Sequence, residues 1–128
     1  MIELVLRKIT LALPLTITKA SYSGEVLSLV GQDWNLHTLS AWRIAKSGRV
    51  LVGCYDKNNR EALEALSNKQ VVRVFAQSDR VPVDPVFELS TGVFIEIFST
   101  DTFEPWVLKL PGGPIFAASP SIPNAFAD

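Results

Sequence analysis

The residues best suited to nucleophilic chemistry are a single histidine, His37, and a single cysteine, Cys54. A catalytic arrangement would need Cys54 as the nucleophile, His37 as its base, and Asp33 or Asp56 to orient the imidazole ring. A reactive cysteine usually lies at a helix N-terminus or beside a cation, whereas the residues around Cys54 alternate as in a strand. We therefore expect Cys54 in the core, His37 as an ordinary strand residue, no catalytic residues and no enzymatic activity.

Metal and cofactor sites are not expected either. A structural zinc site needs three or four Cys or His ligands, and the sequence contains only two such residues. It has no D-x-D-x-D-G calcium loop and no glycine-rich phosphate loop, since Gly112-Gly113 is followed by proline. A single cysteine rules out an internal disulfide and is typical of a reducing compartment, so we expect a cytoplasmic protein.

Carboxylates are concentrated in the second part of the chain. The net charge is −1, yet residues 61–128 carry four Lys and Arg against nine Asp and Glu. One interpretation is a solvated sheet face with acidic turns. The other is a docking surface for a basic partner protein, with Asp84, Glu88 and Glu96 as its binding residues. The overall charge argues against nucleic-acid binding, which needs a basic surplus.

Aromatic residues suggest a second kind of site. The three tryptophans and their aromatic neighbours are explained most simply as core, because each ring buries a large area. The alternative is an aromatic-lined pocket or partner surface with Trp42 or Trp106 at its mouth. Arg43 follows Trp42 and points to the opposite face, where it would be either an exposed anchor or a solvated strand residue.

Two short helices are predicted. Apolar residues at helical spacing predict the first over residues 2–13, ended by Pro14. The second covers residues 58–67: Asn58 would cap it, Glu61 would complete a capping box, and Asn68 suits the left-handed residue after its end. The apolar run of the first helix is too short for a membrane span, which needs about 20 residues, and too interrupted for a signal peptide.

Most of the remaining chain alternates with a period of two, which indicates antiparallel strands. The segments Lys46-Ser47-Gly48 and Ser90-Thr91-Gly92 read as hairpin turns. We expect one long strand over residues 34–44, and an edge strand at residues 115–116. The other strands are expected near residues 15–22, 26–30, 50–55, 71–75, 86–89, 93–98 and 106–108.

The predicted fold class is α+β, with one or more antiparallel meander sheets and two short helices. The two halves each run from a helix through short strands to a tryptophan, so two αβββ repeats are one interpretation; any αβββ pattern would look alike. A chain of 128 residues fits a single domain. We place it at residues 1–118 and expect the proline-rich residues 119–128 to form a flexible tail.

Part of the sequence resembles a pattern found in a group of small uncharacterised bacterial proteins. The shared features are DPVFELSTG at residues 84–92, IEIFS at residues 95–99 and PWV at residues 105–107, together with the earlier Trp34 and Trp42-Arg43. The resemblance covers roughly residues 30–110. It implies no established activity and no catalytic residue, and its general form is similar to immunity or accessory proteins that bind one partner.

Three functional hypotheses follow. The first is a non-enzymatic, immunity-like binding or accessory protein that acts through an acidic sheet face on a basic partner protein. The second is a small-ligand-binding domain with an aromatic-lined pocket. The third is an enzyme that uses carboxylates on its strands. Free sheet edges and an apolar C-terminal segment also suggest a homodimer.

Overall fold

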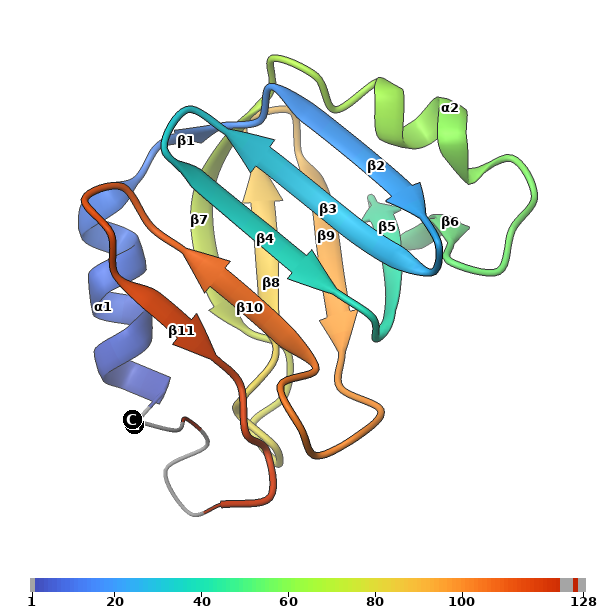
Figure 1. Cartoon of the computed structure of the whole chain (residues 1–128). Coiled ribbons are helices and arrows are strands. Elements are labelled where there is room, and N and C mark those ends of the chain that lie inside the picture. Colours follow the sequence, from blue (N-terminus) through green and yellow to red (C-terminus); the bar gives the residue numbers. More distant parts are fainter. Residues whose placement is uncertain (1, 123–125, 127–128) are drawn as a thin grey trace.

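The computed structural model describes residues 2–122 and residue 126, which form two antiparallel β-sheets and two α-helices (Figure 1). The predicted α+β class is therefore confirmed. In chain order the elements are α1 (Ile2–Ala12), β1 (Leu15–Thr16), β2 (Lys19–Ser23), β3 (Val26–Gly31), β4 (Trp34–Thr38), β5 (Ala41–Lys46), β6 (Arg49–Gly53), α2 (Asn59–Glu64), β7 (Gln70–Ala76), β8 (Pro85–Leu89), β9 (Val93–Phe98), β10 (Trp106–Lys109) and β11 (Ile115–Ala117).

Each sheet combines strands from both parts of the chain. The six-stranded sheet has the order β1-β7-β8-β9-β5-β6, and the five-stranded sheet has the order β11-β10-β4-β3-β2. The chain passes from the five-stranded to the six-stranded sheet between β4 and β5, and returns between β9 and β10. The hairpin β5–β6 thus extends β7-β8-β9, and the hairpin β10–β11 extends β2-β3-β4.

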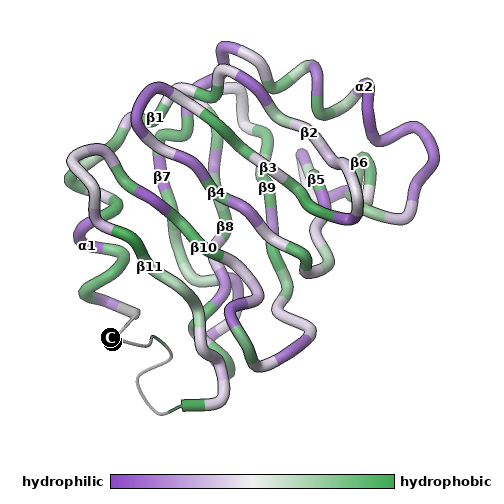
Figure 2. The backbone as a smooth tube through the Cα atoms, viewed as in Figure 1, coloured by the Kyte–Doolittle hydropathy of each residue, from purple (hydrophilic) through white to green (hydrophobic). Residues whose placement is uncertain are grey.

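The core lies between the two sheets and takes roughly every second residue of the strands. Successive side chains of a strand point to opposite faces, so hydrophobic and hydrophilic residues are interleaved along the chain (Figure 2). Apart from Val86, the buried apolar residues form one continuous cluster. Its largest fully buried side chains are Trp42, Trp106, Phe87, Ile9, Ile17, Leu27, Leu29, Leu36, Leu63, Leu89, Ile95 and Ile97.

The two helices lie at opposite sides of the sheet pair (Figure 1). Helix α1 packs against β7 and buries Val5 and Ile9, whereas α2 packs against β2 and β6 and buries Leu63. The end of α1 two residues before Pro14 agrees with the prediction. Among the described residues, no helix combines the length and the hydropathy needed to cross a membrane.

Helix α2 is shorter than predicted. It ends at Glu64, and the side chain of Asn58 makes no capping hydrogen bond within the described residues, so the predicted capping box with Glu61 is wrong. With φ −102° and ψ 21°, Asn58 lies outside the extended region from which an N-cap side chain reaches the first free N–H groups. Asn68 has the predicted left-handed backbone, with φ 68°.

The predicted single strand over residues 34–44 is wrong, because β4 and β5 belong to different sheets. Between them, the backbone N–H of Ser40 donates to the Thr38 hydroxyl oxygen at 3.0 Å. Both hydroxyls donate to the carbonyl oxygen of Pro105, at 2.7 Å from Thr38 and 3.4 Å from Ser40. These bonds fix the bend between the sheets. The alternation of buried and exposed residues continues across this bend, because both sheets face the same core.

The predicted hairpin turns are confirmed. Ser47 and Gly48 connect β5 and β6 with φ 53° and 75°, and two positive φ values are typical of the tight turn that matches strand twist. Residues 90–92 connect β8 and β9. Strand β11 closes one edge of the five-stranded sheet, as predicted for residues 115–116.

The segment predicted as a flexible tail, residues 119–128, falls partly outside the described residues. Within it, Phe126 is buried and forms an antiparallel bridge with Ala118. Its ring packs edge-to-face on Trp106, with 5.5 Å between the ring centroids. This contact attaches Phe126 to the core.

Candidate functional site

His37 and Cys54 lie far apart in the fold. His37 is on the outer face of the five-stranded sheet, where its Nδ1 atom is 2.8 Å from the hydroxyl oxygen of Ser28. Cys54 follows β6 of the other sheet and is buried, as predicted. Within the described residues, no three His, Cys, Asp or Glu side chains are close enough together to hold a metal ion.

The two tryptophans considered for the mouth of a pocket both lie in the core. Trp42 is 2% exposed and Trp106 is 1% exposed. Trp42 packs edge-to-face on Tyr22, with ring centroids 5.3 Å apart. The indole nitrogens differ: Trp106 Nε1 donates to Asp84 Oδ1 at 3.1 Å, whereas Trp42 Nε1 has no hydrogen-bond partner among the described residues.

This difference predicts unequal effects of two matched substitutions. Trp42→Phe and Trp106→Phe remove the same atoms from two buried positions, but only the second breaks a hydrogen bond to a carboxylate. We expect Trp106→Phe to lower the free energy of unfolding by about 2 kcal/mol more than Trp42→Phe, because a hydrogen bond to a charged group contributes about 1.5–3 kcal/mol. Urea titrations followed by circular dichroism measure both values. Equal losses would contradict this account.

Asp84 is an interior residue that joins distant segments. It is 7% exposed and directly precedes β8. Its Oδ2 atom accepts a hydrogen bond from the backbone N–H of Ser99 at 2.6 Å, and its Oδ1 atom accepts from the Ser99 hydroxyl and from Trp106 Nε1. The carboxylate thereby ties β8 to the crossover between β9 and β10, and it is not available to a surface partner.

Glu88 and Glu96 lie on the outer face of the six-stranded sheet, each opposite an arginine. Glu96 pairs in register with Arg43 of β5, and Glu88 with Arg73 of β7. The distances between Nη2 and the carboxylate oxygen are 2.9 Å for Arg43–Glu96 and 2.6 Å for Arg73–Glu88. The three carboxylates predicted as one acidic surface are therefore separated: one is buried and two are neutralised by neighbours.

Beside the Arg43–Glu96 pair, the outer face is hollowed by a groove of about 480 Å³. One wall consists of Phe75 and Phe94, whose rings meet edge-to-face above β8 with centroids 6.3 Å apart. Ala45 lies between Phe94 and Val50 in the register, and its small side chain leaves the space that these larger neighbours border. The groove is thus apolar at its base and aromatic on one side.

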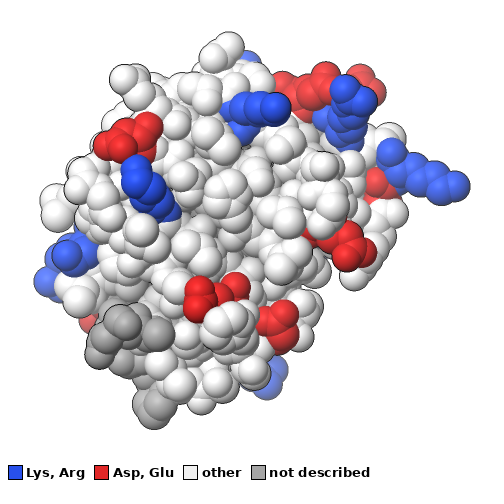
Figure 3. All heavy atoms as spheres, viewed as in Figure 1, with Lys and Arg blue, Asp and Glu red and all other residues white. Residues whose placement is uncertain are grey.

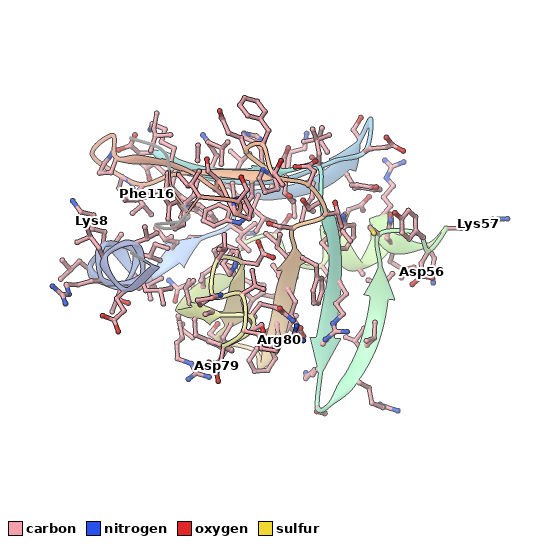
Figure 4. All side chains as sticks on the ribbon, turned by 90° about the horizontal axis from the view of Figure 1, so that it is seen from below. Lys8, Asp56, Lys57, Asp79, Arg80 and Phe116 are labelled. Carbon is pink, nitrogen blue, oxygen red and sulfur yellow. The ribbon has the colours of Figure 1, made fainter. Side chains whose placement is uncertain are left out.

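The rim of the groove is cationic. Arg43, Lys46 and Arg49 line it together with one acid, Glu96, which gives a formal charge of +2. Arg43 is paired with Glu96, but Lys46 and Arg49 have no ion-pair partner among the described residues. Both lie on the β5–β6 hairpin, which extends away from the five-stranded sheet (Figure 4). The unpaired positive charge therefore lies at the turn end of the groove, in the register row of Lys46, Arg49 and Val93, whereas Glu88 and Glu96 on the face predicted to be acidic are compensated by arginines.

The outer face of the five-stranded sheet has a different character. Figure 3 views this face and shows its charged side chains mainly around the rim. Across the middle, one row of the register consists of Ser21, Ser28, His37, Val107 and Ala117. These side chains are mostly small, and they carry neither the aromatic wall nor the cationic rim of the opposite face. The groove on the six-stranded sheet is the stronger candidate site.

Sequence reasoning identified Arg43 and Glu96 but missed the rest of this groove. A usable signal was present in β9, where Phe94, Glu96 and Phe98 share one face. A glutamate between two phenylalanines at a spacing of two indicates a face that is partly open to water. The contributions of Lys46 and Arg49 depend on β5 pairing with β9, which no local pattern indicates.

Comparisons of the chain with protein-family models, with curated proteins and with solved structures find no match. The resemblance of residues 30–110 to a group of bacterial proteins therefore stays a prediction.

Proposed function

We propose that this chain is a non-enzymatic binding protein, and that the groove on the outer face of the six-stranded sheet is its site. The observation that carries the proposal is the combination of an apolar base, the aromatic wall of Phe75 and Phe94, and a rim with a formal charge of +2. Such a site suits an acidic protein partner that inserts an apolar side chain and places a carboxylate at the rim.

The composition of the groove favours binding over catalysis. Its lining contains neither histidine, cysteine nor a hydroxyl-bearing side chain within the described residues. Its one carboxylate, Glu96, accepts hydrogen bonds from Arg43 Nε and Nη2 at 3.3 and 2.9 Å. A carboxylate held in this way by an arginine supports the arrangement of the rim.

The sign of the partner's charge differs from the sequence-based expectation. A basic partner was expected from Asp84, Glu88 and Glu96, but the first is buried and the others are paired with arginines. The unpaired charges that remain beside the groove are those of Lys46 and Arg49. Complementarity across an interface therefore favours an acidic partner.

A second candidate function is the binding of a small ligand. The groove volume of about 480 Å³ lies within the range of about 300–1,000 Å³ that is usual for small-molecule sites. An aromatic carboxylate would match the same wall and rim. This candidate would be favoured if the protein bound a small aromatic carboxylate and had no measurable affinity for acidic peptides.

Charge reversal at the rim tests the proposal. The probe is a peptide array in which Phe or Leu is flanked by Asp and Glu, beside a matched array with Lys in place of the acids. We expect the acidic array to bind preferentially, and the double variant Lys46→Glu/Arg49→Glu to lose about tenfold in affinity, because both cations lie at the turn end of the groove, where their charge attracts the acids of the probe. Each affinity is measured by fluorescence polarisation at two salt concentrations.

The control is the double variant Lys8→Glu/Lys19→Glu, which makes the same change of charge away from the groove. Lys8 lies on α1, which packs beside β7, and Lys19 lies on an edge strand of the five-stranded sheet. Preferential binding of the Lys array, or an equal loss of affinity in both double variants, would overturn the proposal.

A further inference from the structure

Strand β6 is a free edge of the six-stranded sheet. It is the last strand in the order, and among the described residues it pairs with β5 alone. Next to the turn it carries two consecutive exposed apolar residues, Val50 at 55% and Leu51 at 53% exposure. At its other end the edge is blocked, because the Gly53 N–H donates to Asp56 Oδ2 at 2.8 Å. The segment from Arg49 to Val52 is the part open to a further strand.

Two hollows border this edge, one on each face of the sheet. On the outer face lies the groove described above, which β6 lines with Arg49 and Val50. Beside the inner face lies a smaller hollow of about 320 Å³ between β6 and α2. Val52, which pairs with the inward-facing Ile44, lines this second hollow together with Ala62 and Ala65 of α2.

This arrangement matches the requirements of strand addition. An extended peptide that pairs with an edge strand gains main-chain hydrogen bonds, and its side chains point alternately to the two faces. Here the groove borders Arg49 and Val50 of the open segment, and the second hollow borders Leu51 and Val52, with the register shift of β6 against β5 between them. Alternate side chains of an added strand would therefore reach the groove and the space beside α2.

We infer that the ligand of the groove is an extended segment of an acidic partner protein, which binds β6 as an additional strand. This inference rests on the proposed function. One set of alternate residues carries carboxylates and a large apolar side chain into the cationic groove. The other set carries small apolar side chains toward Ala62 and Ala65 of α2.

Charge favours a partner protein over a second copy of this chain. A second copy added through its own β6 would bring Lys46 and Arg49 to an edge that already carries them. Like charges brought together across an interface oppose association, whereas acids on a partner would be attracted. The exposed Val50 and Leu51 would supply the apolar contact both to a partner protein and to a second copy. The charges therefore distinguish between the two occupants.

The test uses a displayed library of ten-residue peptides with a period of two. Glu and Phe vary on one face and Val and Ala on the other, and a matched library carries Lys in place of Glu. We expect binders from the Glu library alone. The best binder is then resynthesised with one N-methyl group at each position in turn, and each affinity is measured by fluorescence polarisation.

Strand addition predicts an alternating result. In an added strand every second N–H points to β6, so N-methylation at those positions lowers affinity about tenfold or more, and N-methylation at the others leaves it unchanged. Filling the groove with Ala45→Trp also abolishes binding, whereas Ala117→Trp, on an edge strand of the other sheet, does not.

The outcomes separate the two proposals. Binders that are lost in Ala45→Trp but show no period of two under N-methylation would leave the groove as the site and overturn strand addition. No binder from the Glu library, or binders insensitive to Ala45→Trp, would overturn both proposals. A chain that is dimeric in light scattering, and monomeric as Leu51→Lys, would mean that a second copy takes the edge, which overturns the inference.

Discussion

Replacing Asp84 by alanine is expected to lower the free energy of unfolding by about 3 kcal/mol, because hydrogen bonds to a charged group contribute about 1.5–3 kcal/mol and buried donors are left unpaired. The carboxylate accepts from the Ser99 backbone, from the Ser99 hydroxyl and from the buried indole N–H of Trp106. All three donors lose their partner in Asp84→Ala. Asp84→Asn keeps one acceptor oxygen, so about half of the loss is expected.

Urea titrations followed by circular dichroism measure these losses, with Glu88→Ala as the control. Glu88 is also paired with a cation, but its partner Arg73 is 62% exposed, and exposed ion pairs contribute about 0–1 kcal/mol. Among the three variants, Glu88→Ala is therefore expected to be the most stable, Asp84→Asn intermediate and Asp84→Ala the least stable. A loss in Asp84→Ala no larger than that in Glu88→Ala would show that the buried carboxylate contributes little.

Gly31→Ala is the second substitution with a large expected effect. Gly31 ends β3 and pairs with Trp34 at the start of β4. A methyl group at Gly31 would overlap with Trp34 Nε1 and with the carbonyl oxygen of Thr16, which are joined by a hydrogen bond of 2.9 Å. The indole must move, which breaks this bond and disturbs the packing of a buried ring. We expect a loss of about 3 kcal/mol, at the upper end of overpacking costs.

A second strand glycine provides the matched control. At Gly53 an added methyl group would meet its nearest atoms, Asp56 Oδ2 and the Trp42 carbonyl oxygen, at 3.9 Å. Its backbone is also not left-handed, so Gly53→Ala is expected to change the free energy of unfolding by less than about 1 kcal/mol. Near-ultraviolet circular dichroism, which reports on tryptophan packing, should change in Gly31→Ala alone. Equal stability of the two variants would rule out the steric account.

The strand and turn positions were largely predictable because they depend on local chemistry. The alternation of residues 93–98 and the glycine at position 48 indicate a strand and a tight turn without knowledge of the rest of the chain. The strand residues that share a face toward the core were also largely predictable, since both sheets cover one core. The division of residues 34–44 between two sheets was missed because it depends on Pro105, which accepts hydrogen bonds across 65 and 67 positions.

The candidate site was predictable only in part, for a related reason. Arg43 and Glu96 were both singled out, but their neutralising contact joins residues 53 positions apart. Asp84 was interpreted as a surface acid because carboxylates are rarely buried unless paired, and its partner Trp106 lies 22 positions away. Charge along the sequence thus overstated the acidity of this face, because the arginines that compensate Glu96 and Glu88 arrive with β5 and β7.

The exchange of strands between the two sheets has a consequence for how the protein unfolds. Removing the first 57 residues would take β1, β5 and β6 from the six-stranded sheet, and removing the remainder would take β10 and β11 from the five-stranded one. Neither piece retains an intact layer, and both contribute to a single apolar cluster. Unfolding of one part exposes the apolar core residues of the other part to water. The two parts should therefore unfold together in a single cooperative transition.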